Sequence, residues 1–367
     1  MRRERFSGYR ILTQSLLFIF SIFISWTAQA DDDADYRLKI TTKFADAWQN
    51  ENWPVLESME NQYLNPSERT PSGKRSLAVF EKNLSWFISI RPIATTLELI
   101  KSNSSFETEE SVNGPPPSRY EIVNQEWDKV ESKINNWNKA FPNSPNPKLA
   151  KAEYYIERGS YFRGSRWASD VHKEAWPIHQ QNFDAAKKLL IDTQSVSRQN
   201  PIWFSLMLTI AGAQSSPQQE IYTLITDTLE NGQGYPDAIQ SAFHFMQPRW
   251  GGSYQQMDDF AQLANQKTEK QEHGGIYARL YWIMVSSSND EMNQGFFKRS
   301  GVSWPMLSQS FEAIIQRFPA PRNISGYALF ACMANDIPKA KHLLIDANSP
   351  KYIESWPREL QQLCSPF

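Results

Sequence analysis

The stretch "PIWFSLMLTIAGAQSSPQQEIYTLITDTLENGQGYPDAIQSAFHFM" (residues 201–246) decides the fold class. It contains three short runs in which apolar residues recur at helical spacing, over 202–213, 218–230 and 236–246. Turns that carry Pro or Gly separate the runs, and no strand-like alternation of apolar and polar residues competes with them. The pattern predicts an all-α chain in which helical hairpins stack into a solenoid.

The same pattern continues along the chain on both sides of this stretch. Upstream, 34–63 predicts two helices broken at Trp53-Pro54, and 73–101 predicts a helix that Arg91-Pro92 kinks or ends. The remaining runs predict helices at 147–163, 177–197, 254–268, 274–286, 305–317, 324–334 and 337–346. The chain has 22 Pro, 15 Gly and 13 Trp, which suits packed helices with Pro at their starts.

Trp-Pro pairs recur as a device for starting helices. Pro is favoured at the first helical position because its missing N–H would have no partner there. The four pairs are Trp53-Pro54, Trp176-Pro177, Trp304-Pro305 and Trp356-Pro357. Their unequal spacing predicts a repeated helix start without a fixed repeat length.

The first thirty residues have the three parts of a secretory signal peptide. Residues 1–10 are basic, 11–26 are apolar, and small residues stand at Ala28 and Ala30. We expect cleavage before Asp31 and a periplasmic or secreted mature chain without a transmembrane domain. An uncleaved membrane anchor is the alternative.

A polar, Pro-rich and acidic segment at 102–118 predicts a linker. The expected organisation is therefore a signal peptide over 1–30, an N-terminal helical region over 31–101, the linker, and a helical repeat domain over 119–367. The only two cysteines, Cys332 and Cys364, lie near the end of the chain. In an oxidising compartment they can form one disulfide, and the alternative is two reduced thiols.

The least helix-like segment, "QPRWGGSYQQMDD" (247–259), lies between two amphipathic runs. It has a structural interpretation as a corner. Gly251 and Gly252 would supply positive φ, Ser253 and Gln256 would form a capping box, and Trp250 would be buried between the two helices.

The alternative interpretation is functional. Arg249 and the free backbone N–H groups of the next helix would then form a seat for an anion.

This segment resembles the P-[KR]-W-G-G-S motif of the bacterial domain of unknown function 4034 family. "ERGSYFRGSRWASDVHKEAWPIHQQNFDAAKKLL" (157–190) and "FPAPRNISGYALFACMANDIPKAKHLL" (318–344) are similar to other segments of that family. The resemblance covers roughly 119–346 and implies an all-helical, tetratricopeptide-like domain with no established activity.

A second candidate surface is "YYIERGSYFRGSRW" (154–167), where aromatic residues alternate with arginines. Rings and guanidinium groups side by side suit peptide or glycan recognition, because rings stack and Arg makes bidentate hydrogen bonds. The alternative is that the rings fill gaps between helices and the arginines face water. The candidate binding residues of both segments are Arg158, Tyr161, Arg163, Trp167, Arg249 and Trp250.

The composition excludes some functions and leaves others open. A formal net charge of −2 and the lack of a basic stripe argue against nucleic acid as a partner. No metal-binding, nucleophile or phosphate-loop motif stands out, so we expect no cofactor and no metal. The favoured hypothesis is a scaffold that binds a protein or peptide in the cell envelope. An envelope hydrolase acting on cell-wall or glycan material and an immunity-type inhibitor are the alternatives, and the oligomeric state stays open.

Overall fold

The computed structural model describes residues 32–89, 119–164, 168–286, 295–347 and 353–365. Most of these residues are helical, and within them the only β pairing is an isolated bridge between Arg69 and Arg75. The prediction of an all-α chain is therefore confirmed. The predicted signal peptide, the linker and Trp167 lie outside the described residues.

Three helices make up the N-terminal region, namely α2 (Asp32–Gln49), α3 (Trp53–Tyr63) and α4 (Ser76–Ile88). The longer helices that follow are α6 (Arg119–Ala140), α7 (Asn146–Arg163), α8 (Ala175–Asp192), α10 (Ile202–Ala213), α11 (Gln218–Asn231), α12 (Pro236–Phe245), α13 (Tyr254–Lys267), α15 (Ile276–Ser286), α17 (Trp304–Arg317), α18 (Pro321–Met333) and α19 (Ile337–Ala347). Short helical turns complete the order: η1 (Ala168–Asp170), α9 (Gln194–Ser197), η2 (Pro248–Trp250), α14 (Glu269–Glu272), α16 (Phe296–Ser300) and α20 (Arg358–Cys364).

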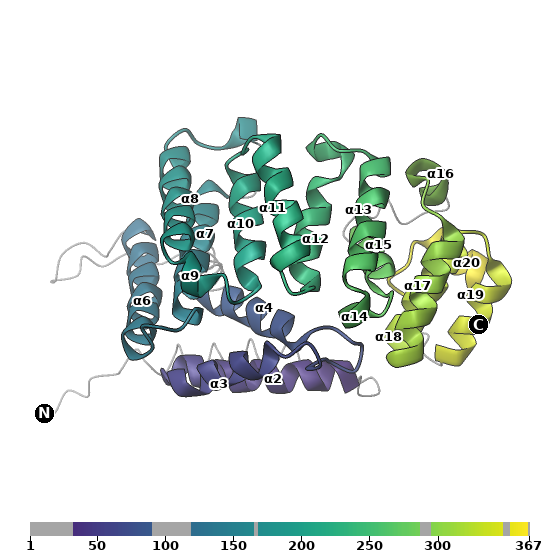
Figure 1. Cartoon of the computed structure of the whole chain (residues 1–367), viewed down its shortest axis with the longest axis horizontal. Coiled ribbons are helices and arrows are strands. Elements are labelled where there is room, and N and C mark those ends of the chain that lie inside the picture. Colours follow the sequence, from purple (N-terminus) through teal and green to yellow (C-terminus); the bar gives the residue numbers. More distant parts are fainter. Residues whose placement is uncertain (1–31, 90–118, 165–167, 287–294, 348–352, 366–367) are drawn as a thin grey trace, which may run out of the picture.

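From α6 onward the helices stand side by side in chain order, and neighbours pack as hairpins (Figure 1). The helices α2 and α3 lie crosswise beneath the lower ends of these helices instead of extending the row (Figure 1). Trp53 and Trp304 are the first residues of α3 and α17, and each is followed by Pro in the first turn. The Trp-Pro pairs thus mark helix starts at these two positions, as expected from the missing N–H of Pro.

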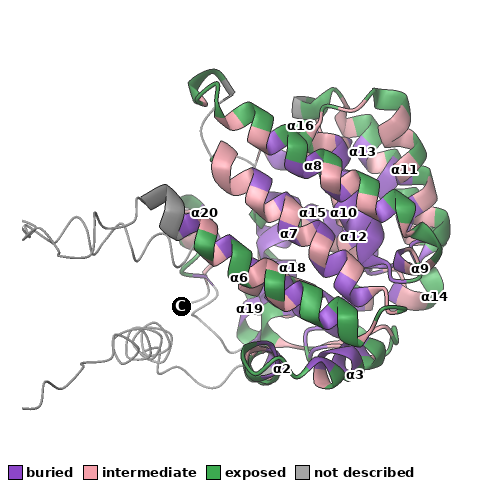
Figure 2. Ribbon diagram, turned by 90° about the vertical axis from the view of Figure 1, so that its left-hand side faces the viewer, coloured by how far each residue is buried: buried purple, intermediate pink, exposed green. Residues whose placement is uncertain are grey.

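The apolar faces of the helices point inward and form two clusters of buried side chains (Figure 2). The first cluster joins the N-terminal helices to α6, α7, α8 and α10, and in it Trp53 stacks on Trp137 with ring centroids 5.6 Å apart. The second cluster runs from α10 to α20, and in it Phe311 stacks on Tyr327 at 5.2 Å. The N-terminal helices therefore share a core with the helices that follow the linker.

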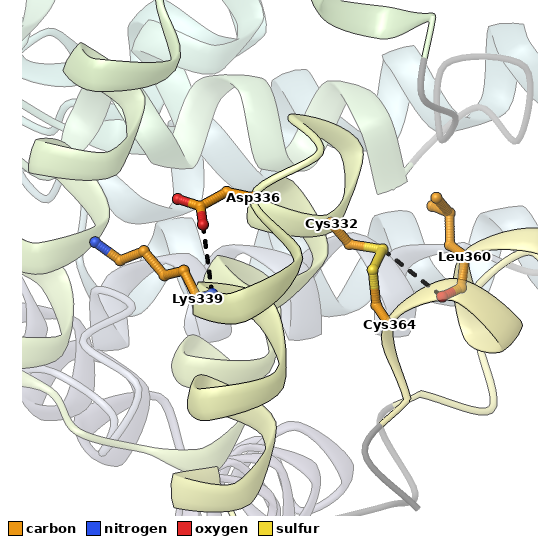
Figure 3. Close-up of a disulfide and its surroundings, with 5 residues drawn as sticks. All are labelled: Cys332, Asp336, Lys339, Leu360 and Cys364. Carbon is orange, nitrogen blue, oxygen red and sulfur yellow. Dashed lines mark hydrogen bonds between the residues drawn. A yellow bond between two sulfur atoms is a disulfide. The ribbon is translucent and has the colours of Figure 1, made fainter.

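A disulfide joins Cys332 of α18 to Cys364 of α20, with Cα atoms 6.0 Å apart (Figure 3). Both cysteines are fully buried. Because 32 residues separate them in sequence, the bond holds the C-terminal helix against the end of the row.

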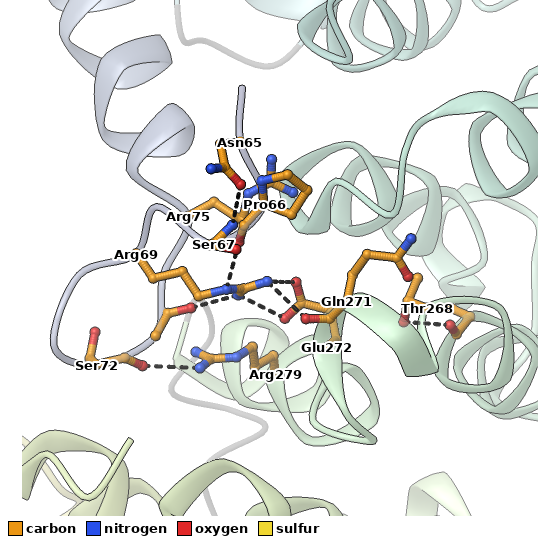
Figure 4. Close-up of polar contacts among 12 residues, drawn as sticks. Asn65, Pro66, Ser67, Arg69, Ser72, Arg75, Thr268, Gln271, Glu272 and Arg279 are labelled. Carbon is orange, nitrogen blue, oxygen red and sulfur yellow. Dashed lines mark hydrogen bonds and ion pairs between the residues drawn. The ribbon is translucent and has the colours of Figure 1, made fainter. Parts of the chain in front are cut away.

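The loop between α3 and α4, residues 64–75, connects the N-terminal region to the far half of the chain (Figure 4). Within this 64–75 loop, Arg69 forms a bidentate ion pair with Glu272 of α14, at 2.6 and 3.2 Å. The carbonyl oxygen of Ser72 accepts hydrogen bonds from Arg279 of α15 and Asn323 of α18, each at 3.0 Å. These contacts hold the N-terminal helices against the lower ends of the helices in the row.

The 64–75 loop approaches Phe318 so closely that it requires a glycine at position 73. Gly73 has φ +79°, and a Cβ added there would lie 2.4 Å from the ring of Phe318. Any other residue would therefore suffer both an unfavourable backbone conformation and a steric clash.

Candidate functional site

The corner at 247–253 lies between α12 and α13, and its first residues form the short turn η2. The expectation for Trp250 was wrong, because its ring is 52% exposed instead of buried between the helices. The turn places this ring at the rim of a cavity, with its centroid 5.4 Å from that of His244 and 6.3 Å from that of Phe245.

The two glycines of the corner have different roles. Gly251 has φ +87°, as expected, whereas Gly252 is not in the positive-φ region. Gly252 is instead required by space, since a Cβ there would lie 2.0 Å from the carbonyl oxygen of Met246.

The capping box was only half correct. The Ser253 hydroxyl accepts a hydrogen bond from the backbone N–H of Gln256 at 3.2 Å, as an N-cap does. The Gln256 side chain does not return the bond, and donates to the Tyr222 hydroxyl of α11.

A cavity of about 520 Å³ opens beside this corner, between α10, α12 and α15. We call it the apolar cavity because large apolar side chains form its walls, namely Phe243, Phe245, Trp250, Leu280, Ile283 and Met284. Polar groups are few and include Gln240, Ser241 and His244. Apolar walls with a small number of polar groups are typical of ligand-binding pockets, which have volumes of roughly 300–1,000 Å³.

A second cavity, of about 420 Å³, lies between the N-terminal helices and α12, α15 and α18. We call it the cationic cavity because Arg and Lys outnumber carboxylates among its lining residues. Gln240 and Ile283 line both cavities, so the two adjoin each other. The predicted binding residues do not include any that line the cationic cavity.

The arginines of the 154–167 segment interact with aromatic rings of their own hairpin. The guanidinium carbon of Arg158 lies 5.6 Å from the ring centroid of Phe162, and that of Arg163 lies 5.6 Å from the ring centroid of Trp176 on α8. Tyr161 is half-buried and packs edge-on against Trp127 at 5.9 Å. None of Arg158, Tyr161 and Arg163 lines either cavity.

The segment 154–167 and the corner therefore do not form one site within the described residues. Trp250 alone of the predicted binding residues is placed at a cavity. Arg249 belongs to η2, but its side chain, like all of Trp167, lies outside what the structure describes. The role of these two residues stays a prediction.

Buried carboxyl groups occur away from both cavities. Glu57 accepts hydrogen bonds from Trp137, Ser144 and Asn146 at 2.7–2.8 Å, yet burial still raises the pKa of its carboxyl. Burial and the charge of Glu57 raise the pKa of Glu60 well above its ordinary value. Neither lines a described cavity, and their contacts tie α3 to later helices, so we assign them a structural role.

Neither of the two cavities brings a His together with a carboxylate among its described lining residues. The apolar cavity has His244 but no carboxylate among its lining residues, and the cationic cavity has carboxylates but no His. Among the described residues there is also no cluster of His, Cys, Asp and Glu placed to hold a metal ion.

Comparisons with known proteins add no relative. No family model matches the chain, and no curated protein and no solved structure matches it. The resemblance to the domain of unknown function 4034 family thus rests on the quoted residues alone. In the part of the chain that the structure describes, no helix is both long and apolar enough to cross a membrane.

Proposed function

We propose that this protein is an exported helical scaffold that binds a peptide or protein partner in the cell envelope through the apolar cavity. The observation that carries the proposal is the cavity itself, of about 520 Å³, with Trp250 exposed at its rim. Exposed aromatic anchors beside an apolar pocket are typical of protein-binding sites, because they bury a large area at low conformational cost. The export rests on the signal-like residues 1–30.

The partner we expect is a short segment with at least one large apolar side chain. That side chain would enter the cavity. The backbone of the bound segment would form hydrogen bonds with Gln240, Ser241 and His244 at the wall. Helical hairpins that stack as tetratricopeptide repeats do form a continuous surface on which such a segment can bind. We extend this solenoid arrangement to the present chain as part of the proposal.

The test is binding of the purified protein to an array of synthetic peptides of random sequence. We expect the bound peptides to be enriched in aromatic and large aliphatic residues. Ile283→Arg, which places a charge at the cavity, should abolish this binding. Ile283 is 40% exposed, and Ile345→Arg, at a 61% exposed site away from both cavities, is the matched control.

Two results would contradict the proposal. One is an array on which the wild-type protein binds no peptide above background. The other is equal loss of binding in the Ile283 and Ile345 variants, since that would place recognition elsewhere.

A further inference from the structure

Positively charged side chains outnumber negatively charged ones in the lining of the cationic cavity. Six cationic side chains line it, against three carboxylates. The cations are Arg37, Lys74, Arg75, Lys82, Arg279 and Arg322.

Each of the three carboxylates already has a cationic partner. Asp33 pairs with Arg37 at 2.9 Å, and Asp237 pairs with Lys74 at 3.7 Å. Glu272 pairs with Arg69, which comes from outside the lining. Within the described residues this leaves Arg75, Lys82, Arg279 and Arg322 without an ion pair.

Arg75 is the most unusual of these four cations. Its side chain is 1% exposed, and only its Nη2 has a hydrogen-bond partner, the carbonyl oxygen of Leu64 at 3.0 Å. Its Nε and Nη1 have no partner within the described chain. A buried donor without an acceptor costs about 1–3 kcal/mol, more when it carries charge, so the two unpaired donors of Arg75 lower the stability of the fold.

Arg279 adds a second, half-buried cation to the same wall. Its Nη2 donates to the carbonyl oxygen of Ser72, but it has no carboxylate partner, and burial lowers the pKa of its guanidinium. The nearby Glu81 does not offset this charge, because burial raises the pKa of its carboxyl to about 8 and Tyr235 donates a hydrogen bond to it. Glu272 and Asp237 act on the charges of Arg75 and Arg279 but form an ion pair with neither, so an anion bound between these arginines would offset the cost of their burial.

We propose that the cationic cavity is a binding site for a small ligand bearing carboxylate or phosphate groups. Lys82 and Arg322 are exposed at the cavity and would contact the anion directly, while Arg75 and Arg279 provide positive potential from the buried wall. Arg suits this role because its planar fork bonds two oxygens of a carboxylate or phosphate at once.

The cavity also limits the size of the ligand. A volume of about 420 Å³ accommodates a small molecule and excludes a folded domain. The ring of Trp282 lies beneath Arg322, with its centroid 5.9 Å from the guanidinium carbon, and adds one apolar surface. The site does not depend on the proposed peptide function, and the absence of peptide binding would leave it unaffected.

The test is isothermal titration calorimetry of the purified protein at low ionic strength, with citrate and inorganic pyrophosphate as separate probes. Binding of citrate alone would identify a carboxylate ligand, and binding of pyrophosphate alone a phosphate ligand. Affinity should fall as salt is added, because the contacts are ionic. The trimethyl ester of citrate, which lacks the charges, should not bind.

The decisive variant is Lys82→Gln/Arg322→Gln, which we expect to weaken binding of the active probe at least tenfold. The control is Lys341→Gln/Arg358→Gln, which makes the same change in net charge at exposed positions outside both cavities. Unchanged melting temperatures would show that both variants are folded. Binding of neither probe, or equal weakening in the two variants, would overturn the assignment.

Discussion

The ion pair between Arg69 and Glu272 should be the strongest single polar link between the N-terminal region and the rest of the chain. Its side chains are only 9% and 2% exposed, and two nitrogens of Arg69 contact two oxygens of Glu272. Removing one partner of a buried pair costs about 3–5 kcal/mol, because the other charge is left buried and unpaired. Arg69 would keep its hydrogen bonds to the carbonyl oxygens of Pro66, Gly73 and Gln271, so we expect Glu272→Leu to cost about 3 kcal/mol.

The double variant Arg69→Met/Glu272→Leu should be less destabilised than the sum of the two single variants, with a coupling of about 2 kcal/mol. Urea unfolding followed by far-ultraviolet circular dichroism measures these free energies. The control pair is Lys188 and Asp192, whose side chains are 75% and 54% exposed. An exposed pair of this kind contributes under about 0.5 kcal/mol.

Additive effects of the Arg69 and Glu272 substitutions would refute this reasoning. So would a cost of each single variant no larger than that of the Lys188 or Asp192 control. Either result would mean that the 64–75 loop is not fixed to α14 by this pair.

Three further changes have expected outcomes. Cys332→Ser/Cys364→Ser should lower the free energy of unfolding by about 3.5 kcal/mol, from the chain entropy of a cross-link that spans 32 residues, and denaturant unfolding with and without reductant measures it. Gly73→Ala should cost more than 2 kcal/mol of stability, because its Cβ would clash with Phe318, and should lower the melting temperature; an unchanged value would contradict the docking of the loop. Burial raises the pKa of Glu153 from 4.5 to about 7, so this carboxyl stays protonated to a higher pH in the folded state than in the unfolded state. The free energy of unfolding should therefore fall as the pH rises through this range. In Glu153→Gln that fall should be smaller by up to about 3 kcal/mol, as read from unfolding curves across the same range.

The positions of the helices could be predicted well from the sequence, because helix periods and Pro or Gly turns are local signals. The run at 202–213 coincides with α10, and the run at 305–317 differs from α17 by one residue. The short α16 and α20 were missed, since one or two turns show little periodicity.

The candidate sites were less accessible to prediction, for a physical reason. Cations of the cationic cavity come from α2, the 64–75 loop, α4, α15 and α18, and only the tertiary arrangement gathers them. The Arg-rich segment 154–167 was conspicuous because its residues are neighbours in sequence, yet Arg158 and Arg163 interact within their own hairpin. Trp250 was correctly predicted to lie at the corner between two helices, but it was predicted to be buried and is exposed. The one-turn helix η2 sets the direction of its ring, and the sequence pattern did not predict this turn.

The 64–75 loop has a consequence for how this chain acquires its shape. Its partners Arg279 and Asn323 lie 207 and 251 positions later than Ser72, so a growing polypeptide cannot complete these bonds until most of it has been synthesised. Contacts between such distant residues form slowly, because a long intervening segment must first be closed into a loop. For the export that we propose, this delay would be an advantage, because a chain that closes late stays open during passage through a secretion channel.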